Sequence, residues 1–288
     1  MAVQKDIETL VDDIYDMFRT GKDFTPGDTA ELASRLARAI TKKFKIRKGP
    51  ARRDKLRPSN IGQPDRLLYF NVKADPIEDK FAPEQLLNFL YGDICEELML
   101  WLAEQSGHEV THMQHPVNGY GLRGYMDCRI DGKNVDAKSA FAANFKKFKD
   151  GSIKAPGKDP YGYIAQLSYY EQVQGGSDTA YFFAFNKIGS WALTAVNPVE
   201  QGNAEARVKH LTEILKKDEP PEELCYEPEP DGKAGNMKLG IHCSRCDHKR
   251  KCHPDLRTFA YKPWRYLTHV EKLPKVEEVL PIEEVEPV

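Results

Sequence analysis

The sequence feature that most constrains the fold is Asp131-Gly132, a two-residue turn signal with alternating apolar and polar residues on both sides. A two-residue turn places Ile130 opposite Lys133, and counting outward brings Asp127 opposite Asp136. Because side chains alternate along a strand, one face of this hairpin should be apolar. That face would carry Met126, Cys128, Ile130, Val135 and Ala137. We therefore predict a hairpin over residues 122–139 with this face against a core.

The opposite face of the hairpin is polar and carries Tyr125, Asp127, Arg129, Asn134, Asp136 and Lys138. Two carboxylates roughly 5 Å apart across a strand pair repel each other and destabilise it. A divalent cation between them would remove the repulsion, and oxygen ligands suit Mg²⁺ or Mn²⁺. Lys138 would then lie beside the metal, where an ammonium can hold a phosphate oxygen or orient an activated water. An exposed hairpin with scattered charges is the alternative.

Residues 83–107 form the strongest helix candidate, because apolar residues recur along one stripe and Gly107 follows as a stop signal. Acidic residues inside so apolar a helix need a reason, and Glu96 and Glu97 are the candidates. Position on the helix slightly favours Glu97 as the acid with a functional role, because Glu97 flanks the apolar stripe. Further along the chain, residues 161–170 should form a helix with Gln166 and Tyr170 on one face. Residues 179–185 and 190–196 are expected to extend a central sheet.

Two amphipathic segments, residues 5–20 and 28–44, predict a helical hairpin that packs on the main domain. Basic residues crowd residues 42–57, and we expect Arg52 and Arg53 to contact a phosphate backbone rather than merely face solvent. A second basic stretch, residues 141–158, contains Lys146, Lys147 and Lys149 among glycine and proline. We expect it to be a mobile loop that also contacts nucleic acid.

The net charge of −2 excludes a general electrostatic attraction to nucleic acid, so binding must come from local basic patches. No stretch approaches 18 apolar residues, and the N-terminus lacks an apolar signal core. We therefore expect a soluble cytoplasmic protein without membrane contact. The acidic, proline-bearing residues 271–288 should be a disordered tail.

Three of the six cysteines follow the pattern Cys243-x₂-Cys246-x₅-Cys252. In a reducing compartment such clustering favours metal over disulfide. Three thiolates leave one tetrahedral position open, and Cys225 is the nearest cysteine that no core position explains. His242, His248 and His253 are possible substitutes, and a chance cluster of free thiols is the alternative.

Gly124-x-x-Asp127 followed by Asp136-Ala137-Lys138 resembles the core motif of the PD-(D/E)XK nuclease superfamily. The motif is most similar to the RecB-like exonuclease branch, which includes bacteriophage exonucleases and CRISPR-associated nucleases. Gln166-x-x-x-Tyr170 is a further signature of that branch. Gly92-x-x-x-Glu96 matches its helix motif, so the resemblance favours Glu96 over Glu97, and a small Gly92 would let the helix approach the sheet.

The resemblance covers residues 58–265 and implies an α/β fold, with a mixed central sheet flanked by helices in a restriction-endonuclease-like core. The implied organisation is a helical N-terminal region with a basic linker (1–57), a nuclease core (58–220) and a cysteine metal-binding segment (221–270) before the tail. The implied activity is metal-dependent DNA exonuclease in replication, recombination or repair, with proteins of those processes as possible partners. Glu96, Asp127 and Asp136 would hold Mg²⁺ or Mn²⁺, Lys138 would act on the attacking water, and Gln166 and Tyr170 would contact substrate or brace the site.

The spacing of the cysteines resembles the C-terminal part of the cysteine cage in AddB-like iron–sulfur nucleases. Ser59, Arg66 and Tyr69 match an upstream segment of those relatives, but Pro64 stands where they carry the first cysteine. A 4Fe–4S cluster and a zinc ion, each with Cys225 as fourth ligand, both remain open. Two other functions are open as well: a structure-specific endonuclease or resolvase on the same core, and a non-catalytic zinc module that binds nucleic acid. The oligomeric state is open too.

Overall fold

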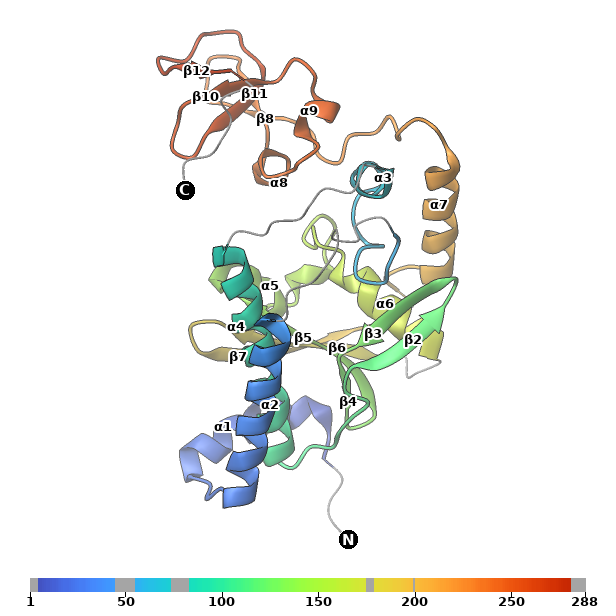
Figure 1. The fold of residues 1–288 in the computed structure, drawn as a ribbon, viewed down its shortest axis with the longest axis vertical. Coiled ribbons are helices and arrows are strands. Elements are labelled where there is room, and N and C mark those ends of the chain that lie inside the picture. The colour runs from blue at the N-terminus through green and yellow to red at the C-terminus, as the bar shows by residue number, and fades with distance from the viewer. Residues whose placement is uncertain (1–4, 45–54, 74–82, 175–178, 199, 281–288) are drawn as a thin grey trace. The chain divides into compact units, whose positions relative to one another are not determined.

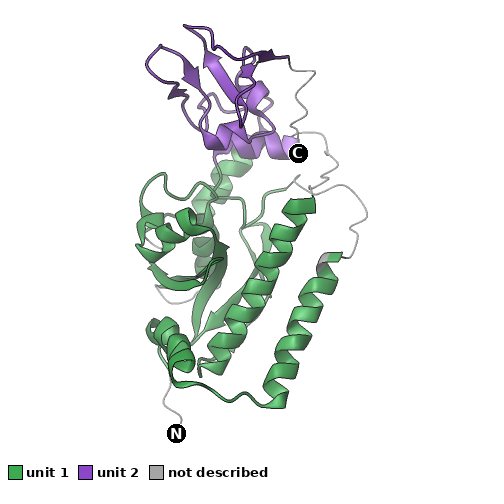
Figure 2. Cartoon of the chain, turned by 90° about the vertical axis from the view of Figure 1, so that its left-hand side faces the viewer, with its two compact units in different colours: residues 1–63, 74–213 green, residues 64–73, 214–288 purple. Residues whose placement is uncertain are grey.

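The computed structural model describes residues 5–44, 55–73, 83–174, 179–198 and 200–280. The chain divides into two compact units (Figure 2). Unit 1 comprises residues 1–63 and 74–213, and unit 2 comprises residues 64–73 and 214–288. Each unit is therefore built from two separate stretches of the chain.

Unit 1 is a mixed α/β structure whose elements are labelled in Figure 1. Its helices are α1 (Leu10–Thr20), α2 (Pro26–Phe44), α4 (Pro83–Gln105), α5 (Ala142–Lys149), α6 (Tyr163–Gln174) and most of α7 (Ala204–Lys216), with short 3₁₀ helices η1 (Ile7–Thr9) and η2 (Ser152–Lys154). The sheet strands are β1 (Val110–Thr111), β4 (Cys128–Ile130), β5 (Lys133–Ala140), β6 (Ala180–Asn186) and β7 (Ser190–Val196), in the order β1-β4-β5-β6-β7. Only β5 and β6 are parallel, so the sheet is mixed, as the sequence predicted.

The hairpin at Asp131-Gly132 forms with the predicted register. Ile130 pairs with Lys133, and Cys128 pairs with Val135. Both turn residues have positive φ, 50° and 79°, as a type I′ turn requires. The five residues of the predicted apolar face are all buried. The strand before this hairpin, β3 (Leu122–Met126), pairs instead with β2 (His115–Gly119) in a separate two-stranded sheet.

Helices cover both faces of the five-stranded sheet. On one face, α1 and α4 pack on Cys128, Ile130, Val135 and Phe183. On the other face, α5 and α6 pack on the strand side chains that point the opposite way, such as Phe182 and Ala184. Both predicted N-terminal helices form, but they pack on the main domain rather than as a hairpin on each other: α1 contacts α4 and β7, and α2 packs along α4. The polar side chains of β5 therefore point toward the face that α6 covers.

Unit 2 has its own small sheet and core. Five short strands lie in the order β12-β10-β11-β9-β8, and Leu239, Leu256 and Tyr266 form the centre of its apolar cluster. Its elements are α3 (Asp65–Lys73), β8 (Glu229–Pro230), β9 (Met237–Lys238), α8 (Ile241–Ser244), α9 (Lys249–Cys252), β10 (Arg257–Phe259), β11 (Arg265–His269) and β12 (Glu278–Val279).

Three further expectations differ from this structure. Residues 64–73, assigned to the nuclease core, form α3 of unit 2. Residues 271–288 are not wholly a disordered tail, because β12 pairs with β10 and the Glu278 carboxylate forms two hydrogen bonds with Arg257, of 2.7 and 2.6 Å. The expected mobile loop at 141–158 contains α5 and η2, which bury Phe145, Phe148 and Ile153. In each case, contacts with residues distant in the sequence stabilise the ordered structure of the segment.

Candidate functional site

Three carboxylates from three segments of unit 1 gather around β5. Asp136 lies on β5, Asp127 directly precedes β4, and Glu96 lies in the middle of α4. The strand ladder ends at Cys128, so Asp127 is not a ladder residue, but its Oδ2 accepts a 3.0 Å hydrogen bond from the Ala137 N–H across the hairpin. The turn signal thus brings Asp127 near Asp136, although the predicted direct pairing of the two across the ladder is not formed.

Asp136 is the most buried of these groups, with only 1% of the residue exposed. Its Oδ1 has no hydrogen-bond partner among the described residues, and its Oδ2 lies 2.6 Å from Lys138 Nζ. A buried carboxylate with an unsatisfied oxygen is costly in free energy. The ion pair with Lys138 offsets only part of that cost.

The pKa values of all three acids are raised. Burial is the largest cause in each case and raises the pKa of Glu96 to about 6, of Asp127 to about 6 and of Asp136 to about 7. The Lys138 ammonium opposes the shift in all three acids, while neighbouring carboxylates raise the pKa further, except that Asp136 lowers the pKa of Asp127 through a hydrogen bond. Acids that share a site and resist ionisation together are typical of positions built to receive a cation.

Lys138 lies between these acids and the aromatic ring of Tyr163. Burial alone would lower the pKa of Lys138, but the carboxylates of Asp136 and Asp127 raise it well above its ordinary value. Its Nζ lies 4.9 Å from the centroid of the Tyr163 ring, within cation–π range. In this arrangement Lys138 is protonated at neutral pH, so it can donate hydrogen bonds but cannot accept a proton.

Gln166 and Tyr170 border the same site from α6. Gln166 Nε2 lies 3.4 Å from the Tyr170 hydroxyl, and both residues are buried. The pKa of Tyr170 is raised to about 12, chiefly by burial, with a smaller upward contribution from the charges of Asp136 and Asp127. A Cβ on Gly124 would lie 3.2 Å from this hydroxyl and 2.7 Å from a Pro58 ring carbon. The glycine of the Gly-x-x-Asp motif therefore lets β3 lie close to Tyr170.

The structure distinguishes Glu96 from Glu97. Burial is the largest cause of the raised pKa of both residues, but their charged neighbours differ. The pKa of Glu96 is lowered by Lys138 and raised by Asp136. The pKa of Glu97 is lowered by cations of α2, namely Arg35, Arg38 and Lys42. Glu96 therefore belongs to the acidic site. A Cβ on Gly92 would lie 3.4 Å from Ser139 Oγ of β5, an ordinary van der Waals contact, so α4 is near the sheet here but its approach does not require a glycine.

Gln114 is a further site residue, and no pattern in the sequence points to it. Its side-chain amide donates a 3.0 Å hydrogen bond to Glu96 Oε1, and its backbone N–H donates a 2.8 Å bond to the Asp127 carbonyl. Its φ of 49° is unusual for a residue other than glycine. One residue thus links the segments that carry two of the three acids. Tyr163 was missed as well, because a tyrosine in an aromatic-rich helix suggests only packing.

The predicted nucleic-acid contacts are only partly described. Arg52 and Arg53 lie outside the described residues. Lys146, Lys147 and Lys149 follow one another along α5, where the first and last are exposed and Lys147 Nζ donates a 3.0 Å hydrogen bond to the Lys158 carbonyl. They occupy a helix, so their charges are held in a fixed arrangement.

Cys225, Cys243, Cys246 and Cys252 are all free thiols in unit 2 and are partly buried. The pKa of Cys243 is raised to about 11, chiefly by burial and also by Cys225, Cys246 and Cys252. The pKa values of Cys225 and Cys246 are also raised, first by burial and then by their cysteine neighbours. Helix α3 contributes directly: the Leu67 backbone N–H donates to Cys225, and Arg66 Nε donates to Cys252 Sγ at 3.3 Å.

Among the described residues, no group of three or more His, Cys, Asp and Glu side chains is already arranged to hold a metal ion. Both sets nevertheless have the donor chemistry of a metal site. The acids offer oxygens, one of them an unsatisfied Asp136 oxygen, and the cysteines offer four neighbouring thiols. Each set would have to close around its metal.

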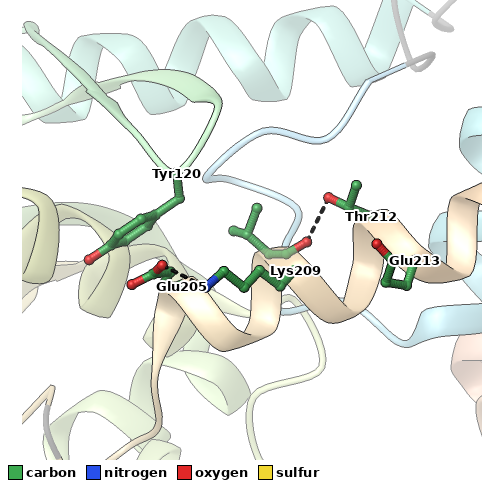
Figure 3. A pocket seen from close by; sticks show the side chains of 6 residues that line it. Tyr120, Glu205, Lys209, Thr212 and Glu213 are labelled. Carbon is green, nitrogen blue, oxygen red and sulfur yellow. Dashed lines mark hydrogen bonds and ion pairs between the residues drawn. The ribbon is translucent and has the colours of Figure 1, made fainter.

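A pocket of about 240 Å³ lies elsewhere in unit 1, between Tyr120 at the β2–β3 turn and one face of α7 (Figure 3). Its charged groups include a Glu205–Lys209 ion pair of 2.9 Å. None of the acids described above lines it. Along the described part of the chain, no helix combines the length and the apolar character needed to cross a membrane.

Comparison with known proteins adds little. No family model matches the chain, and no curated protein matches it. Among solved structures, the crystal structure of SSO0001 aligns with 79% of this chain and 97% of its own, at 15% sequence identity and a TM-score of 0.41. A similarity at this level does not establish a shared fold, so the mixed α/β architecture rests on the strands and helices described above.

Proposed function

We propose that this protein is a metal-dependent deoxyribonuclease of the PD-(D/E)XK type, with Glu96, Asp127, Asp136 and Lys138 at its active site. The observation that carries the proposal is the buried Asp136 carboxylate, which has an unsatisfied oxygen and two further acids of raised pKa beside it. Such an arrangement destabilises a protein that uses it only as structure. Strongly perturbed acids gathered beside one lysine are instead typical of catalytic sites.

The donor set suits Mg²⁺ or Mn²⁺, because both ions prefer carboxylate oxygens. When bound, such an ion lowers the pKa of its water and stabilises charge on a phosphate. Lys138 is placed to donate to a phosphate oxygen or to the attacking water. Gln166 and Tyr170 are placed to donate to the substrate or to brace the acids from α6.

Exonuclease activity is the first choice because the Gln-x-x-x-Tyr pattern and the cysteine spacing resemble the RecB-like branch. A structure-specific endonuclease or resolvase on the same site is the second choice. A non-catalytic zinc module is disfavoured, since a pure DNA-binding surface gains nothing from three acids that repel phosphate. Proteins of DNA replication or recombination are the partners that this activity implies.

The deciding experiment is digestion of end-labelled linear DNA and covalently closed circular DNA with Mg²⁺, Mn²⁺ or EDTA. An exonuclease degrades linear DNA alone, while an endonuclease also cuts the circle. EDTA should abolish either activity. Absence of hydrolysis with both metals, or full hydrolysis in EDTA, would contradict the proposal.

Gln114→Ala should weaken metal binding, because the change removes the amide that holds the Glu96 carboxylate. Loss of an outer partner of a metal ligand costs about 10- to 100-fold in metal affinity or activity. We expect the lower end of that range, since Gln114 is exposed. Calorimetric titration with Mn²⁺ measures the change, and Met113→Ala, on the adjacent exposed residue, is the matched control. Equal Mn²⁺ affinity of Gln114→Ala and wild type would show that Gln114 does not contribute to the metal site.

Neutralising Lys146, Lys147 and Lys149 together to Gln should weaken DNA binding. The salt slope of log K should fall by roughly 0.7–0.9 for each lysine that contacts a phosphate. Fluorescence anisotropy over a range of NaCl concentrations, with Ca²⁺ in place of Mg²⁺, measures that slope. A triple change of Lys209 and Lys216 on α7 and of Lys217 directly after it is the control. If both triple variants keep the wild-type slope, α5 is ordinary solvated surface.

A further inference from the structure

The two-stranded ribbon of β2 and β3 has two unlike faces. One face packs on α6, because a Cβ on Gly119 would lie 2.5 Å from a Val173 methyl group and a Cβ on Gly124 would lie 3.2 Å from the Tyr170 hydroxyl. Side chains alternate along a strand, so the intervening residues point the other way. We call the face that they form the outer face. It carries Pro116, Asn118, Arg123 and Tyr125, all of them exposed.

The outer face begins at the acidic site. The 2.8 Å hydrogen bond from the Gln114 N–H to the Asp127 carbonyl continues the register of the ribbon by one residue pair. Asp127 therefore extends β3, and its side chain falls on the same face as Tyr125 and Arg123. Arg123 lies four residues before Asp127, which corresponds to about 13 Å along a strand.

Arg123 is held in position, but no carboxylate pairs with it in the part of the chain that the structure describes. Its NH2 group donates a 3.2 Å hydrogen bond to the Tyr125 hydroxyl, and its guanidinium carbon lies 5.8 Å from the centroid of the Tyr125 ring. The segment that builds the ribbon contains no acidic residue between Glu109 and Asp127. A guanidinium has five N–H donors in a planar fork that matches a phosphate, so most of the Arg123 donors remain for an anionic ligand.

We propose that Arg123 binds a backbone phosphate of the DNA strand whose scissile phosphate lies at the acidic site. The inference rests on the proposed nuclease function and adds the path of the strand, which follows the outer face of β2 and β3. A distance of about 13 Å spans roughly four phosphates of one B-DNA strand, since these follow one another every 3.4 Å along the helix axis. Both single-stranded and duplex DNA offer such a phosphate, and the contact positions the strand without reading its sequence.

The test is binding of fluorescent DNA in EDTA, where no metal-dependent hydrolysis takes place. Arg123→Gln should weaken binding by roughly tenfold, as expected for one hydrogen-bonded charge. It should also reduce the salt slope of log K by about 0.7 for single-stranded DNA or about 0.9 for duplex DNA. Arg123→Lys keeps the charge and should keep the slope. Arg19→Gln, on an exposed arginine of α1, is the control and should change neither affinity nor slope.

A second arm removes the charge of the phosphate instead of that of the arginine. A series of oligonucleotides, each with one neutral methylphosphonate linkage at a different position, should show one or two positions where wild-type affinity falls. At those positions Arg123→Gln should lose nothing further, because guanidinium and phosphate form one interaction. The same series in single-stranded and in duplex form shows which kind of DNA supplies the phosphate.

Additive losses at every position, or wild-type affinity and slope in Arg123→Gln, would each overturn the phosphate site. If the phosphate site holds but linear DNA is never cut with Mg²⁺ or Mn²⁺, the nuclease proposal fails and the binding site stands. If DNA is cut but Arg123→Gln binds like wild type, the nuclease proposal stands and the phosphate site fails.

Discussion

Asp136→Asn is expected to reduce DNA hydrolysis by roughly 10³-fold or more and to stabilise the metal-free protein. Activity falls because the variant loses the most buried acid of the site, and removal of a single charge-stabilising group already costs about 10²–10³-fold in comparable sites. Stability rises because the buried carboxylate with the unsatisfied oxygen is replaced by a neutral amide of the same shape. Lys138 keeps the Asp127 and Glu96 carboxylates as neighbours.

The stability gain should depend on pH in a defined direction. The pKa of Asp136 is raised in the folded protein to about 7, above its unfolded value of about 4. The folded state therefore binds the proton more tightly, and the free energy of unfolding of the wild type falls as pH rises between about 4 and 7. The advantage of Asp136→Asn should be absent near pH 4 and reach on the order of 4 kcal/mol above pH 7, since the pKa is raised by about three units and one unit corresponds to about 1.4 kcal/mol.

Urea denaturation at pH 4.5, 6 and 8 in EDTA measures this difference, and nuclease assays with Mn²⁺ measure the loss of activity. Mn²⁺ should stabilise the wild type at pH 8 and stabilise the variant much less. Asp150→Asn, on an exposed acid after α5, is the control for a surface charge change. If Asp136→Asn cuts DNA at the wild-type rate, Asp136 is not part of the active site.

Cys243→Ser is expected to unfold much of unit 2 while unit 1 stays folded. We infer that Cys225, Cys243, Cys246 and Cys252 bind one structural metal centre, either a 4Fe–4S cluster or zinc. The apolar cluster around Leu239, Leu256 and Tyr266 in the described part of unit 2 is small, so a bound metal would supply much of the folding free energy of the unit. Structural zinc contributes roughly 10–16 kcal/mol in small zinc modules at neutral pH.

Limited proteolysis and thermal denaturation report the loss of structure, and elemental analysis with absorbance reports the metal. Anaerobic purification should give brown protein with iron and sulfide for a cluster, or colourless protein with one zinc. Cys95→Ala, in the core of unit 1, is the control and should leave the metal content unchanged. Protein with neither metal and four titratable native thiols would exclude the centre. Nuclease activity should fall in Cys243→Ser only indirectly.

Local signals were enough for the hairpin, α4 and the gathering of Asp127, Asp136 and Lys138, because turn chemistry and side-chain alternation are encoded within a few residues. The helix α5 was missed because Phe145 and Phe148 among lysines look like a loop until β6 and β7 supply the surface on which they pack. Strand β12 depends on Arg257, 21 residues away, and no local pattern signals it. The left-handed backbone of Gln114 likewise depends on contacts to α4 and Asp127.

Unit 2 cannot be excised from this protein as a continuous fragment. The chain enters it at residue 64, leaves after residue 73 and returns at residue 214. A recombinant peptide of residues 214–288 would lack α3, and with it the Arg66 and Leu67 donors that face Cys252 and Cys225. During synthesis α3 leaves the ribosome some 140 residues before its partners do, so the cysteine unit is completed last. A proteolytic nick near residue 214 would also leave the two pieces associated through α3 until a denaturant separates them.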